Sequence, residues 1–290
     1  IRSINRSMMS KFRSTLRTLY TSGPVELTRT RALTLARNTD PGERFLYRKS
    51  LAAIRDRMDA ERNLEDVLDT VLEIKPGYPP FQLRAAQLRD ELETLAEIVD
   101  NHAPRTILEI GTHDGGTLYT WARHVDSAEQ IVSLDLPGGD FGGGYSKKKA
   151  TIYQTFNEDV DMRFVRQNSH KHETLEAVSD SLSNPIDFLF IDGDHTYEGV
   201  KQDFEMYTGL CSDDAVVALH DIVTHPDDQE VVARRREEIE SISESHLVWG
   251  DIFSECNVDD FWAELINKYE TREIISHPKQ TWGGIGVVYL

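Results

Sequence analysis

Short apolar runs alternate with helix-compatible stretches from about residue 105 to the end of the chain. The first five runs are rich in Ile, Val, Leu and Phe, and each is followed by a segment that can form a helix. This alternation is typical of a parallel β-sheet that is covered by helices on both faces, so an α/β fold is expected. The predicted strands are TILEIG (106–111), IVSLDL (131–136), MRFVRQ (162–167), IDFLFID (186–192) and AVVALHD (215–221).

Two later runs, REIISH (272–277) and GGIGVVYL (283–290), follow each other closely. Too few residues separate them for a crossover helix, and parallel neighbours need such a crossover. We therefore expect these two strands to pair antiparallel at one edge of the sheet.

The first 100 residues have helical periodicity and no chemical motif. Apolar residues at three- and four-residue steps predict helices over 51–74 and 81–100, and the run KPGYPP (75–80) separates the two. We therefore predict a helical N-terminal appendage over 1–100 and a separate α/β domain over 101–290. Such an appendage would also suit packing between subunits of a homo-oligomer.

Residues 1–20 predict a basic amphipathic helix, with arginines largely off its apolar face. The favoured interpretation is a helix that packs on the body or on a second subunit. The alternatives are a targeting segment or a peripheral contact with an anionic membrane.

Composition narrows the classes of function. The 290 residues carry a net charge of -18, which argues against a nucleic-acid partner because phosphate binding needs a basic surface. The charge is uneven, since residues 1–50 hold 11 Lys and Arg against 3 Asp and Glu. Only two cysteines are present, and no apolar run approaches the ~18 residues of a membrane span, so a cytoplasmic protein is expected.

A glycine-rich loop, LEIGTHDGGT (108–117), follows the first predicted strand. Gly111 can turn sharply beside a ligand, and Gly115 and Gly116 leave free N–H groups at the start of the next helix. His113 stands where the dinucleotide pattern GxGxxG has its second glycine, so a nicotinamide-dependent oxidoreductase is less favoured.

The next two strand ends carry polar residues that suit a nucleoside. Asp135 ends the second strand and can accept both hydroxyls of a ribose, although it could also cap the turn before Pro137. Asn168 and Ser169 follow the third strand, where they could contact an adenine or form a polar turn.

Acids and histidines follow the fourth and fifth strands, in DGDH (192–195) and HD (220–221). Neighbouring strands would bring these side chains together, and oxygen and imidazole ligands suit Mg²⁺, Mn²⁺ or a similar ion. The alternative is that Asp194 caps the next helix and that the second pair is only hydrogen-bonded. His170 and His172 are expected at the surface.

The chain resembles the class I S-adenosylmethionine-dependent methyltransferases over about residues 105–290. Within them it is most similar to the bacterial branch related to cephalosporin hydroxylases and macrolide-sugar O-methyltransferases. The motifs that carry the resemblance are LEIGTHDGGT, SLDLPGGDFGGGY, QNSHKHETLEAV, IDFLFIDGDHTYEGVKQDFEMY, ALHDI and WGGIGVV.

This resemblance implies a Rossmann-like sheet of seven strands with the last one antiparallel, and S-adenosylmethionine as the cofactor. It places the methionine part of the cofactor on the first loop, the ribose on Asp135 and the adenine side on Ser169. The cofactor-binding residues expected from it are Glu109, Gly111, Thr112, Gly115, Asp135, Ser169 and Asp192.

In the sugar-methylating relatives, acids after the fourth and fifth strands hold a metal. Asp192 and Asp221 match two of these ligands, and the third is an acid in the relatives but His220 here, which puts the identity of the metal in question. The catalytic base of the relatives falls on His195.

The resemblance thus implies an O-methyltransferase, assisted by a divalent cation such as Mg²⁺, that acts on a hydroxyl of a sugar, glycan or glycosylated metabolite. Two alternatives stay open: hydroxylase-like chemistry on the same fold, or an adaptor that docks through residues 1–20. Two segments are expected near the ligands, the loop GGDFGGGY (138–145) over a ligand and residues 223–257 on the acceptor side.

Overall fold

A computed structural model describes residues 39–138, 144–225, 230–231, 233–234 and 256–290. The predicted amphipathic helix over 1–20 and most of the segments 138–145 and 223–257 lie outside these residues. The chain forms two compact units, residues 1–56 with 76–82 and residues 57–75 with 83–290. This division does not coincide with the predicted boundary at residue 100, which stays a prediction.

The second unit contains a seven-stranded sheet in the order β3-β2-β1-β4-β5-β7-β6. Strands β1 to β5 run parallel, and β7 pairs antiparallel with both β5 and β6, which confirms the predicted edge. The strands are β1 (Thr106–Ile110), β2 (Gln130–Asp135), β3 (Asp161–Arg166), β4 (Ile186–Ile191), β5 (Cys211–His220), β6 (Glu270–Ile274) and β7 (Ile285–Tyr289).

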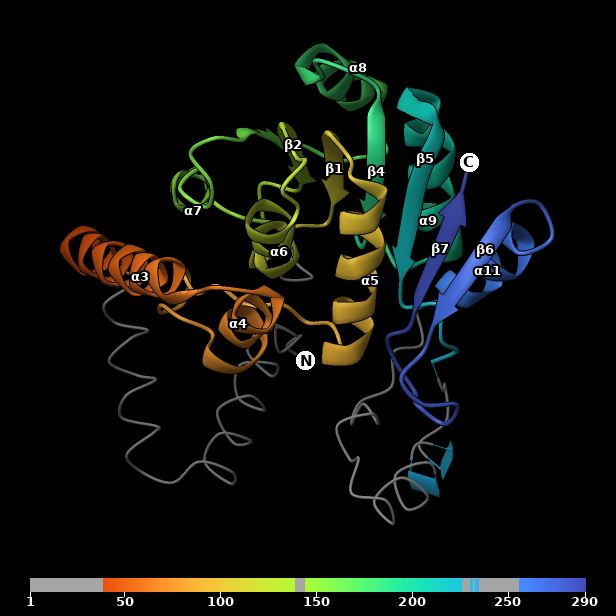
Figure 1. The fold of residues 1–290 in the computed structure, drawn as a ribbon, viewed down its shortest axis with the longest axis horizontal. Coiled ribbons are helices and arrows are strands. Elements are labelled where there is room, and N and C mark those ends of the chain that lie inside the picture. The colour runs from red at the N-terminus through yellow and green to blue at the C-terminus, as the bar shows by residue number, and fades with distance from the viewer. Residues whose placement is uncertain (1–38, 139–143, 226–229, 232, 235–255) are drawn as a thin grey trace, which may run out of the picture. The chain divides into compact units, whose positions relative to one another are not determined.

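Helices cover the sheet on both faces, as the buried central strands require, since β1 is buried at every position. Figure 1 shows α5 and α6 in front of the sheet and α9 behind it. The helices of the second unit are α4 (Leu64–Leu68), the π-helix η1 (Asp69–Ile74), α5 (Arg89–His102), α6 (Gly116–His124), α7 (Lys147–Tyr153), α8 (His172–Ser181), α9 (Tyr197–Tyr207), the 3₁₀ turn η2 (Thr208–Leu210) and α11 (Val258–Leu265).

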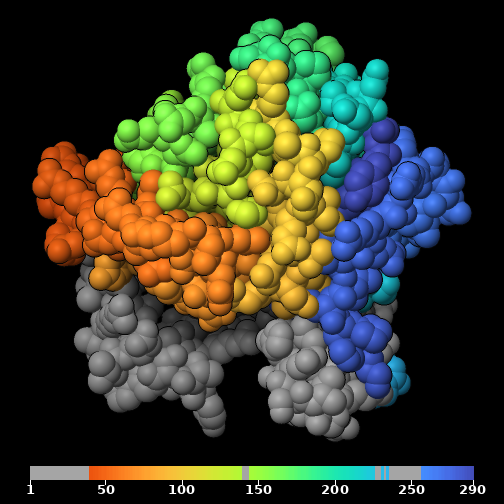
Figure 2. All heavy atoms as spheres, in the orientation of Figure 1, coloured from red at the N-terminus to blue at the C-terminus, as the bar shows by residue number. Residues whose placement is uncertain are grey.

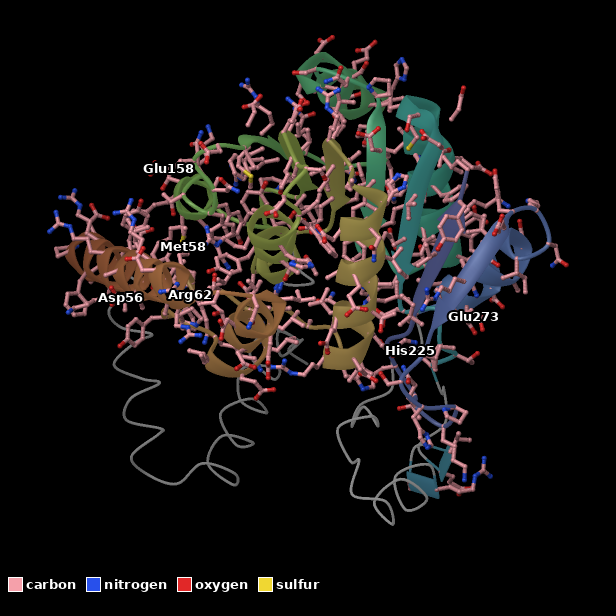
Figure 3. The ribbon with its side chains drawn as sticks, in the orientation of Figure 1. Asp56, Met58, Arg62, Glu158, His225 and Glu273 are labelled. Atoms are coloured by element: carbon pink, nitrogen blue, oxygen red, sulfur yellow. The ribbon has the colours of Figure 1, made fainter. Side chains whose placement is uncertain are left out.

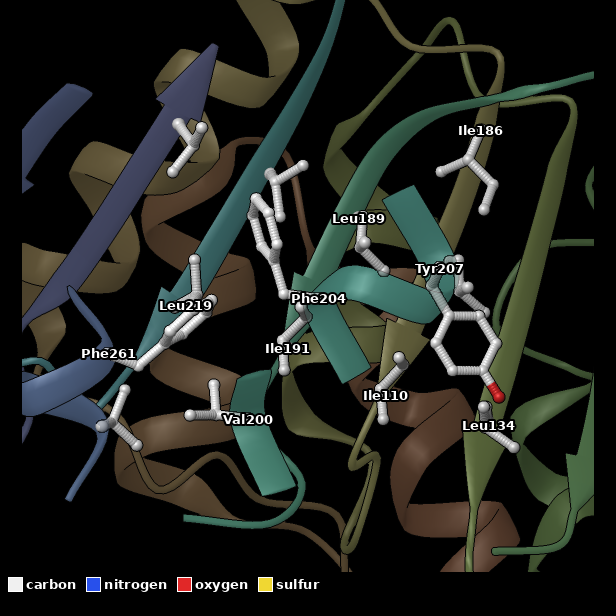
Figure 4. Close-up of a cluster of buried hydrophobic side chains, with 14 of the residues drawn as sticks. Ile110, Leu134, Ile186, Leu189, Ile191, Val200, Phe204, Tyr207, Leu219 and Phe261 are labelled. Atoms are coloured by element: carbon white, nitrogen blue, oxygen red, sulfur yellow. The ribbon is translucent and has the colours of Figure 1, made fainter. Parts of the chain in front are cut away.

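Helix α9 is anchored by large apolar side chains on one face (Figure 4). Phe204 lies in the same buried cluster as Ile191 of β4, and its ring meets Phe261 of α11 edge to face at 5.6 Å between centroids. Contacts of this kind fix the position of a helix, so the loop between β4 and α9 starts and ends on rigid elements.

The segment before the sheet differs from its prediction. Instead of one helix over 51–74, α3 (Asp40–Ala60) ends early and α4 starts after Asn63, whose side chain accepts a hydrogen bond from the N–H of Asp66. The predicted helix over 81–100 starts only at Arg89. A capping asparagine competes with continued helix, which explains the break.

Residues 83–88 run beside the glycine loop instead of forming a helix. Arg84 makes a parallel bridge to Gly115, and a Cβ atom at Gly116 would lie 2.2 Å from the N atom of Ala85. Part of the predicted appendage therefore belongs to the same compact unit as the sheet.

The described part of the first unit comprises most of α3 and residues 76–82. The N–H of Tyr78 donates to Oγ of Ser50 at 2.9 Å, and the rings of Tyr47 and Phe81 meet edge to face. Among the helices that the structure describes, none is long and apolar enough to span a membrane.

Candidate active site

Two carboxylates and two histidines meet beyond the ends of β4 and β5. Nε2 of His195 lies 3.3 Å from Oδ1 of Asp192 and 3.6 Å from Oδ2 of Asp221. Nδ1 of His220 lies 3.2 Å and 3.4 Å from the same two oxygens. The predicted convergence of these four side chains is what the structure shows, and we call them the carboxylate–histidine cluster.

Neutral donors orient both carboxylates of this cluster. The side-chain amide of Gln87 donates to Oδ2 of Asp192 at 2.7 Å, and the N–H of Gly283 donates to Oδ1 of Asp221 at 3.0 Å. Each acid therefore has one oxygen fixed by a donor outside the cluster and turns its other oxygen toward both histidines. Asp221 itself has a left-handed backbone, with φ 64°, a conformation that Asp tolerates better than most residues.

The mutual attraction within the cluster sets its protonation. Burial alone would lower the pKa of His220, but the negative charges of Asp221 and Asp192 raise it well above its ordinary value. Burial would also lower the pKa of His195. The hydrogen bond to Asp192 and the negative charges of Asp221 and Asp192 outweigh burial and raise this pKa. The pKa of Asp192 is lowered because the charge of His220 overcomes burial. The cluster thus favours ionised carboxylates and a charged His220 when no other cation is present.

The cluster fits a divalent cation in donor type and spacing. One atom each from Asp192, His220 and Asp221 lies within 4.8 Å of the others, and two carboxylates with one imidazole form a donor set that suits such an ion. A histidine that binds a metal usually donates its other ring N–H to an acceptor, which orients the ring. Nε2 of His220 is buried and has no such partner among the residues described.

Three residues near the cluster were not identified from the sequence. Gln87 lies in the predicted appendage, where no motif marks it. Cys256 is buried and its Sγ lies within 4.8 Å of ligand atoms of His195 and Asp221, although no other cysteine or histidine is near it in sequence. His225 lies just past the carboxyl end of β5 (Figure 3), and its Nε2 is 3.7 Å from Oδ1 of Asp221. Its position four residues after Asp221 could have marked it in the sequence.

Asp194 lies apart from the cluster. Its Oδ1 accepts the N–H and the hydroxyl of Thr196, and Thr196 in turn caps α9 through the N–H of Gly199. The alternative that Asp194 caps the helix is therefore not what the structure shows, because Thr196 is the cap of α9 and Asp194 holds Thr196.

Protein atoms occupy the space beside each glycine of the first loop. A Cβ atom at Gly111, where φ is 95°, would lie 1.9 Å from the carbonyl oxygen of Asp192, and one at Gly115 would lie 2.5 Å from the ring of Tyr153. These glycines are therefore needed to bring β1, β4 and α7 together around the loop.

Glu109 is the fully buried acid of β1. Its Oε2 accepts the indole N–H of Trp121 at 2.7 Å, and its Oε1 has no hydrogen-bond partner among the described residues. Burial raises the pKa of Glu109 to about 8. An unpartnered buried carboxylate oxygen fits the ammonium group of a methionine moiety, as the resemblance implies.

Backbone donors hold Asp135 at the end of β2. The N–H of His113 donates to its Oδ2 and the N–H of Leu136 to its Oδ1, both at 2.7 Å. Each oxygen keeps a lone pair for a ribose hydroxyl. Thr112 of the same loop forms a buried hydrogen bond with Ser133 of β2 at 2.7 Å, so its hydroxyl braces the loop.

Helix α9 fixes the loop after β3. The hydroxyl of Tyr207 donates to the carbonyl of Ser169 at 2.8 Å, and Nε2 of His170 lies 3.3 Å from Oδ1 of the fully buried Asp203. His172 lies at the surface as expected, at 80% exposed, whereas His170 is only partly exposed, at 21%, because its ring packs against Asp203.

Comparison with known proteins identifies this region. Residues 108–222 match the protein family described as "Methyltransferase domain". This stretch of the chain is a methyltransferase domain. Residues 108–222 contain most of β1 and all of β2 to β5, and with β6 and the antiparallel β7 they complete the seven-stranded sheet of the class I, S-adenosylmethionine-dependent methyltransferase fold.

Two curated relatives share part of this methyltransferase domain. The chain is 32% identical over 122 residues to the uncharacterized protein y4gI of Sinorhizobium fredii, which covers 41% of this chain and 13% of that protein. It is 33% identical over 117 residues to an uncharacterized protein of Acanthamoeba polyphaga mimivirus, which covers 40% of this chain and 50% of that protein. The chain thus spans at most half the length of these relatives.

Solved O-methyltransferases are similar to the chain in structure. One is the enzyme from Bacillus cereus in complex with SAH, with a TM-score of 0.45 and 21% identity, covering 78% of this chain and 90% of that one. Another is TomG from Streptomyces achromogenes in complex with SAM, with a TM-score of 0.48 and 14% identity, covering 84% and 98%.

Proposed function

We propose that this protein is an S-adenosylmethionine-dependent O-methyltransferase that acts on a hydroxyl of a sugar, glycan or glycosylated metabolite with the help of a divalent cation. The observation that carries the proposal is the carboxylate–histidine cluster at the carboxyl ends of β4 and β5, in a domain of methyltransferase fold. In parallel sheets of this kind, ligands bind beyond the carboxyl ends of the strands.

The chain's own residues account for the cofactor side. Glu109 would hold the ammonium group, Asp135 the ribose hydroxyls, and the loop at Ser169 the adenine side, with Gly111, Thr112, Gly115 and Asp192 around them. S-adenosylmethionine supplies, when bound, a methyl group on a sulfonium sulfur that an oxygen nucleophile can displace.

His195 is the residue suited to take the proton from the acceptor hydroxyl. Its ring is more exposed than that of His220, at 38% against 4%, so it is the one that a substrate can reach. The two carboxylates make its Nε2 a stronger base and stabilise the imidazolium that forms. Their fixed oxygens also limit the motion of the ring.

Asp192, His220 and Asp221 would hold the divalent cation. Such an ion, when bound, lowers the pKa of a hydroxyl near it and so eases the transfer of its proton to His195. Binding of a cation would also displace the proton that His220 carries in the ion-paired cluster, since a coordinating imidazole must be neutral.

The test has two stages. In calorimetry, S-adenosylmethionine and its demethylated product should bind, with affinities that differ between Mg²⁺ and EDTA. Methyl transfer to a panel of hydroxyl acceptors should then fall about 10²–10⁴-fold in His195→Ala. The matched control is His172→Ala, an exposed histidine on α8, which should keep wild-type turnover.

Three results would count against the proposal. Absence of cofactor binding would remove the methyltransferase assignment. Binding and turnover that ignore EDTA would remove the cation. Full turnover of folded His195→Ala would remove the base.

A further inference from the structure

A thiol lies beside the carboxylate–histidine cluster. One ligand atom each from His195, Asp221 and Cys256 lies within 4.8 Å of the other two, and Cys256 and Asp221 are buried. A sulfur, an imidazole nitrogen and a carboxylate oxygen differ in type from the donors of Asp192, His220 and Asp221, which include no sulfur. Thiolate ligands favour Zn²⁺ and other softer ions, whereas Mg²⁺ prefers oxygen.

The spacing of these three donors is close to that of a tetrahedral zinc site. Zn–S bonds of about 2.3 Å and Zn–N and Zn–O bonds of about 2.0–2.2 Å place the ligand atoms roughly 3.3–3.6 Å apart. In the structure Nε2 of His195 lies 3.6 Å from Oδ2 of Asp221. The sulfur of Cys256 therefore needs a shift of roughly 1 Å or less to complete the set.

Hydrogen bonds around Asp221 leave one of its oxygens turned toward this donor set. The N–H of Gly283 donates to Oδ1 at 3.0 Å, and the N–H of Gly284 donates to Oε2 of the fully buried Glu91 in α5 at 2.9 Å. In Figure 2 the yellow atoms of α5 border the blue atoms of the C-terminal region. A fixed backbone thus holds Oδ1 and presents Oδ2, as the hydrogen-bond partners of metal-binding carboxylates do.

Cys256 is held beside His195 by the start of α11. The N–H of Asn257 donates to the carbonyl oxygen of His195 at 2.8 Å, which ties the cysteine to the loop between β4 and α9. Cys256 also belongs to the buried hydrophobic cluster that contains Val258 and Phe261 of α11. The thiol and the imidazole therefore come from two segments that are bonded to each other, which favours their binding to one ion.

The thiol of Cys256 becomes a good ligand only when an ion is bound. Burial and the negative charge of Asp221 raise the pKa of Cys256 to about 12, although a hydrogen bond from the backbone of Val258 acts in the opposite direction. A metal ion that binds a thiol displaces its proton, and the charge of the ion then offsets the carboxylates that oppose a free thiolate.

We propose that His195, Asp221 and Cys256 form a second metal site, which binds Zn²⁺ through a thiolate, and that this ion inhibits methyl transfer. The ion occupies the Nε2 lone pair with which His195 takes the proton of the acceptor hydroxyl. On binding, Cys256 releases its thiol proton to the solvent, and no atom changes its oxidation state. The binding of Zn²⁺ stands on the donor set alone, whereas the inhibition rests on the proposed function.

The site can be observed without turnover, because Co²⁺ can replace Zn²⁺ and a thiolate bound to Co²⁺ absorbs in the near ultraviolet. Co²⁺ would be titrated into the full chain under reducing conditions. Wild type should develop this charge-transfer band, and added Zn²⁺ should abolish it. Cys256→Ser and Cys256→Ala should lack the band.

Cys211→Ser is the matched control, since the chain has two cysteines and this variant leaves Cys256 as the one thiol. It should keep the band, and it assigns the ligand even if the Cys256 variants do not fold. Zinc affinity, measured by competition with a chromophoric chelator, should fall about tenfold or more in Cys256→Ser, because a ligand contributes at least as much as a residue that orients one.

The effect on turnover is measured with Mg²⁺ and a hydroxyl acceptor that wild type methylates. Added Zn²⁺ should inhibit wild type and Cys211→Ser. Cys256→Ser should keep wild-type turnover without Zn²⁺ and should need about tenfold more Zn²⁺, or still more, for the same inhibition.

The outcomes separate this site from the proposed function. A wild type without the near-ultraviolet band, or a band that survives in Cys256→Ser, overturns the zinc site whether or not methyl transfer occurs. Binding of Zn²⁺ through Cys256 with an unchanged rate of methyl transfer overturns the inhibition. A band that depends on Cys256 in a protein that binds no S-adenosylmethionine supports the site, and overturns the proposed function and the inhibition with it.

Discussion

The buried Glu109 of β1 and the partly buried Asp192, just after the adjacent strand β4, have pKa values shifted in opposite directions. Glu109 lies within β1, and Asp192 follows β4 and donates its N–H to the carbonyl of Ile110. Burial raises the pKa of Glu109 to about 8, because no cation among the described side chains lies beside it, its hydrogen-bond donors lower the pKa only in part, and the charge of Asp192 raises it further. Burial acts on Asp192 as well, but the charge of His220 and the bond to His195 lower its pKa.

The comparison teaches that neighbours, and not depth alone, decide the charge of a buried acid. A cationic group placed beside Glu109 would lower its pKa again and favour its ionised form, whereas Asp192 is already ionised beside the two histidines.

Glu109→Gln is expected to have the largest effect, on how the free energy of unfolding changes with pH. Below about pH 4.5 the acid is protonated in both states; as pH rises to about 8 the unfolded chain loses this proton and the folded protein keeps it. The free energy of unfolding of wild type should therefore fall over that window, by on the order of 5 kcal/mol from this group.

The glutamine variant should lack this fall. Denaturant titrations of both proteins between pH 4.5 and pH 9 would measure the difference, and calorimetry should show cofactor binding weakened about tenfold. Curves of equal slope for the two proteins would contradict a raised pKa at Glu109.

Asp192→Asn should destabilise the protein by about 3 kcal/mol, because both histidines lose the carboxylate that faces them. The measurement is urea unfolding at pH 7 in EDTA, so that no bound cation intervenes. Asp194→Asn, two residues away and outside the cluster, is the matched control and should cost about 1 kcal/mol. Equal losses in the two variants would mean that the cluster is not specially stabilised.

Asp203→Asn tests the pair that Asp203 of α9 forms with His170 in the loop after β3. The hydrogen bond to Asp203 raises the pKa of His170, so the pair stabilises the fold below pH 6.5 and the effect is lost as pH rises through the raised value. At pH 6 the variant should lose about 1–2 kcal/mol. Well above that value, asparagine should be neutral or stabilising, since the buried carboxylate then faces an uncharged ring.

Other charged groups bear on this pair, since Asp194 also raises the pKa of His170. His170→Asn should therefore be measured alongside, and the two single variants combined in a double-mutant cycle. A coupling between the two sites that does not change with pH would exclude the ion pair.

Tyr153→Phe should have the smallest effect. Its hydroxyl donates to the carbonyl of His113 at 2.8 Å, and the ring that fills the space beside Gly115 would remain. We expect a loss of about 1 kcal/mol in urea unfolding and little change in cofactor affinity. A loss of cofactor binding as large as that of Glu109→Gln would mean that the hydroxyl, and not only the ring, shapes the loop.

The sequence by itself determined the sheet, its antiparallel edge and the cluster. Strands buried on both faces must be apolar runs, so β1 to β5 were visible along the chain, and residues that follow parallel strands must meet at one edge. Asp192, His195, His220 and Asp221 could be brought together by that argument alone.

Only the tertiary structure decided what surrounds them. Gln87 and Cys256 reach the cluster from segments without a motif, because contacts between residues far apart in the chain leave no local pattern. The protonation of Glu109 depended on which side chains pack around it, and the donor set that includes Cys256 exists only because the start of α11 packs beside the loops after β4 and β5. Periodicity reports the face that an element buries, whereas the neighbours of a side chain are fixed by packing.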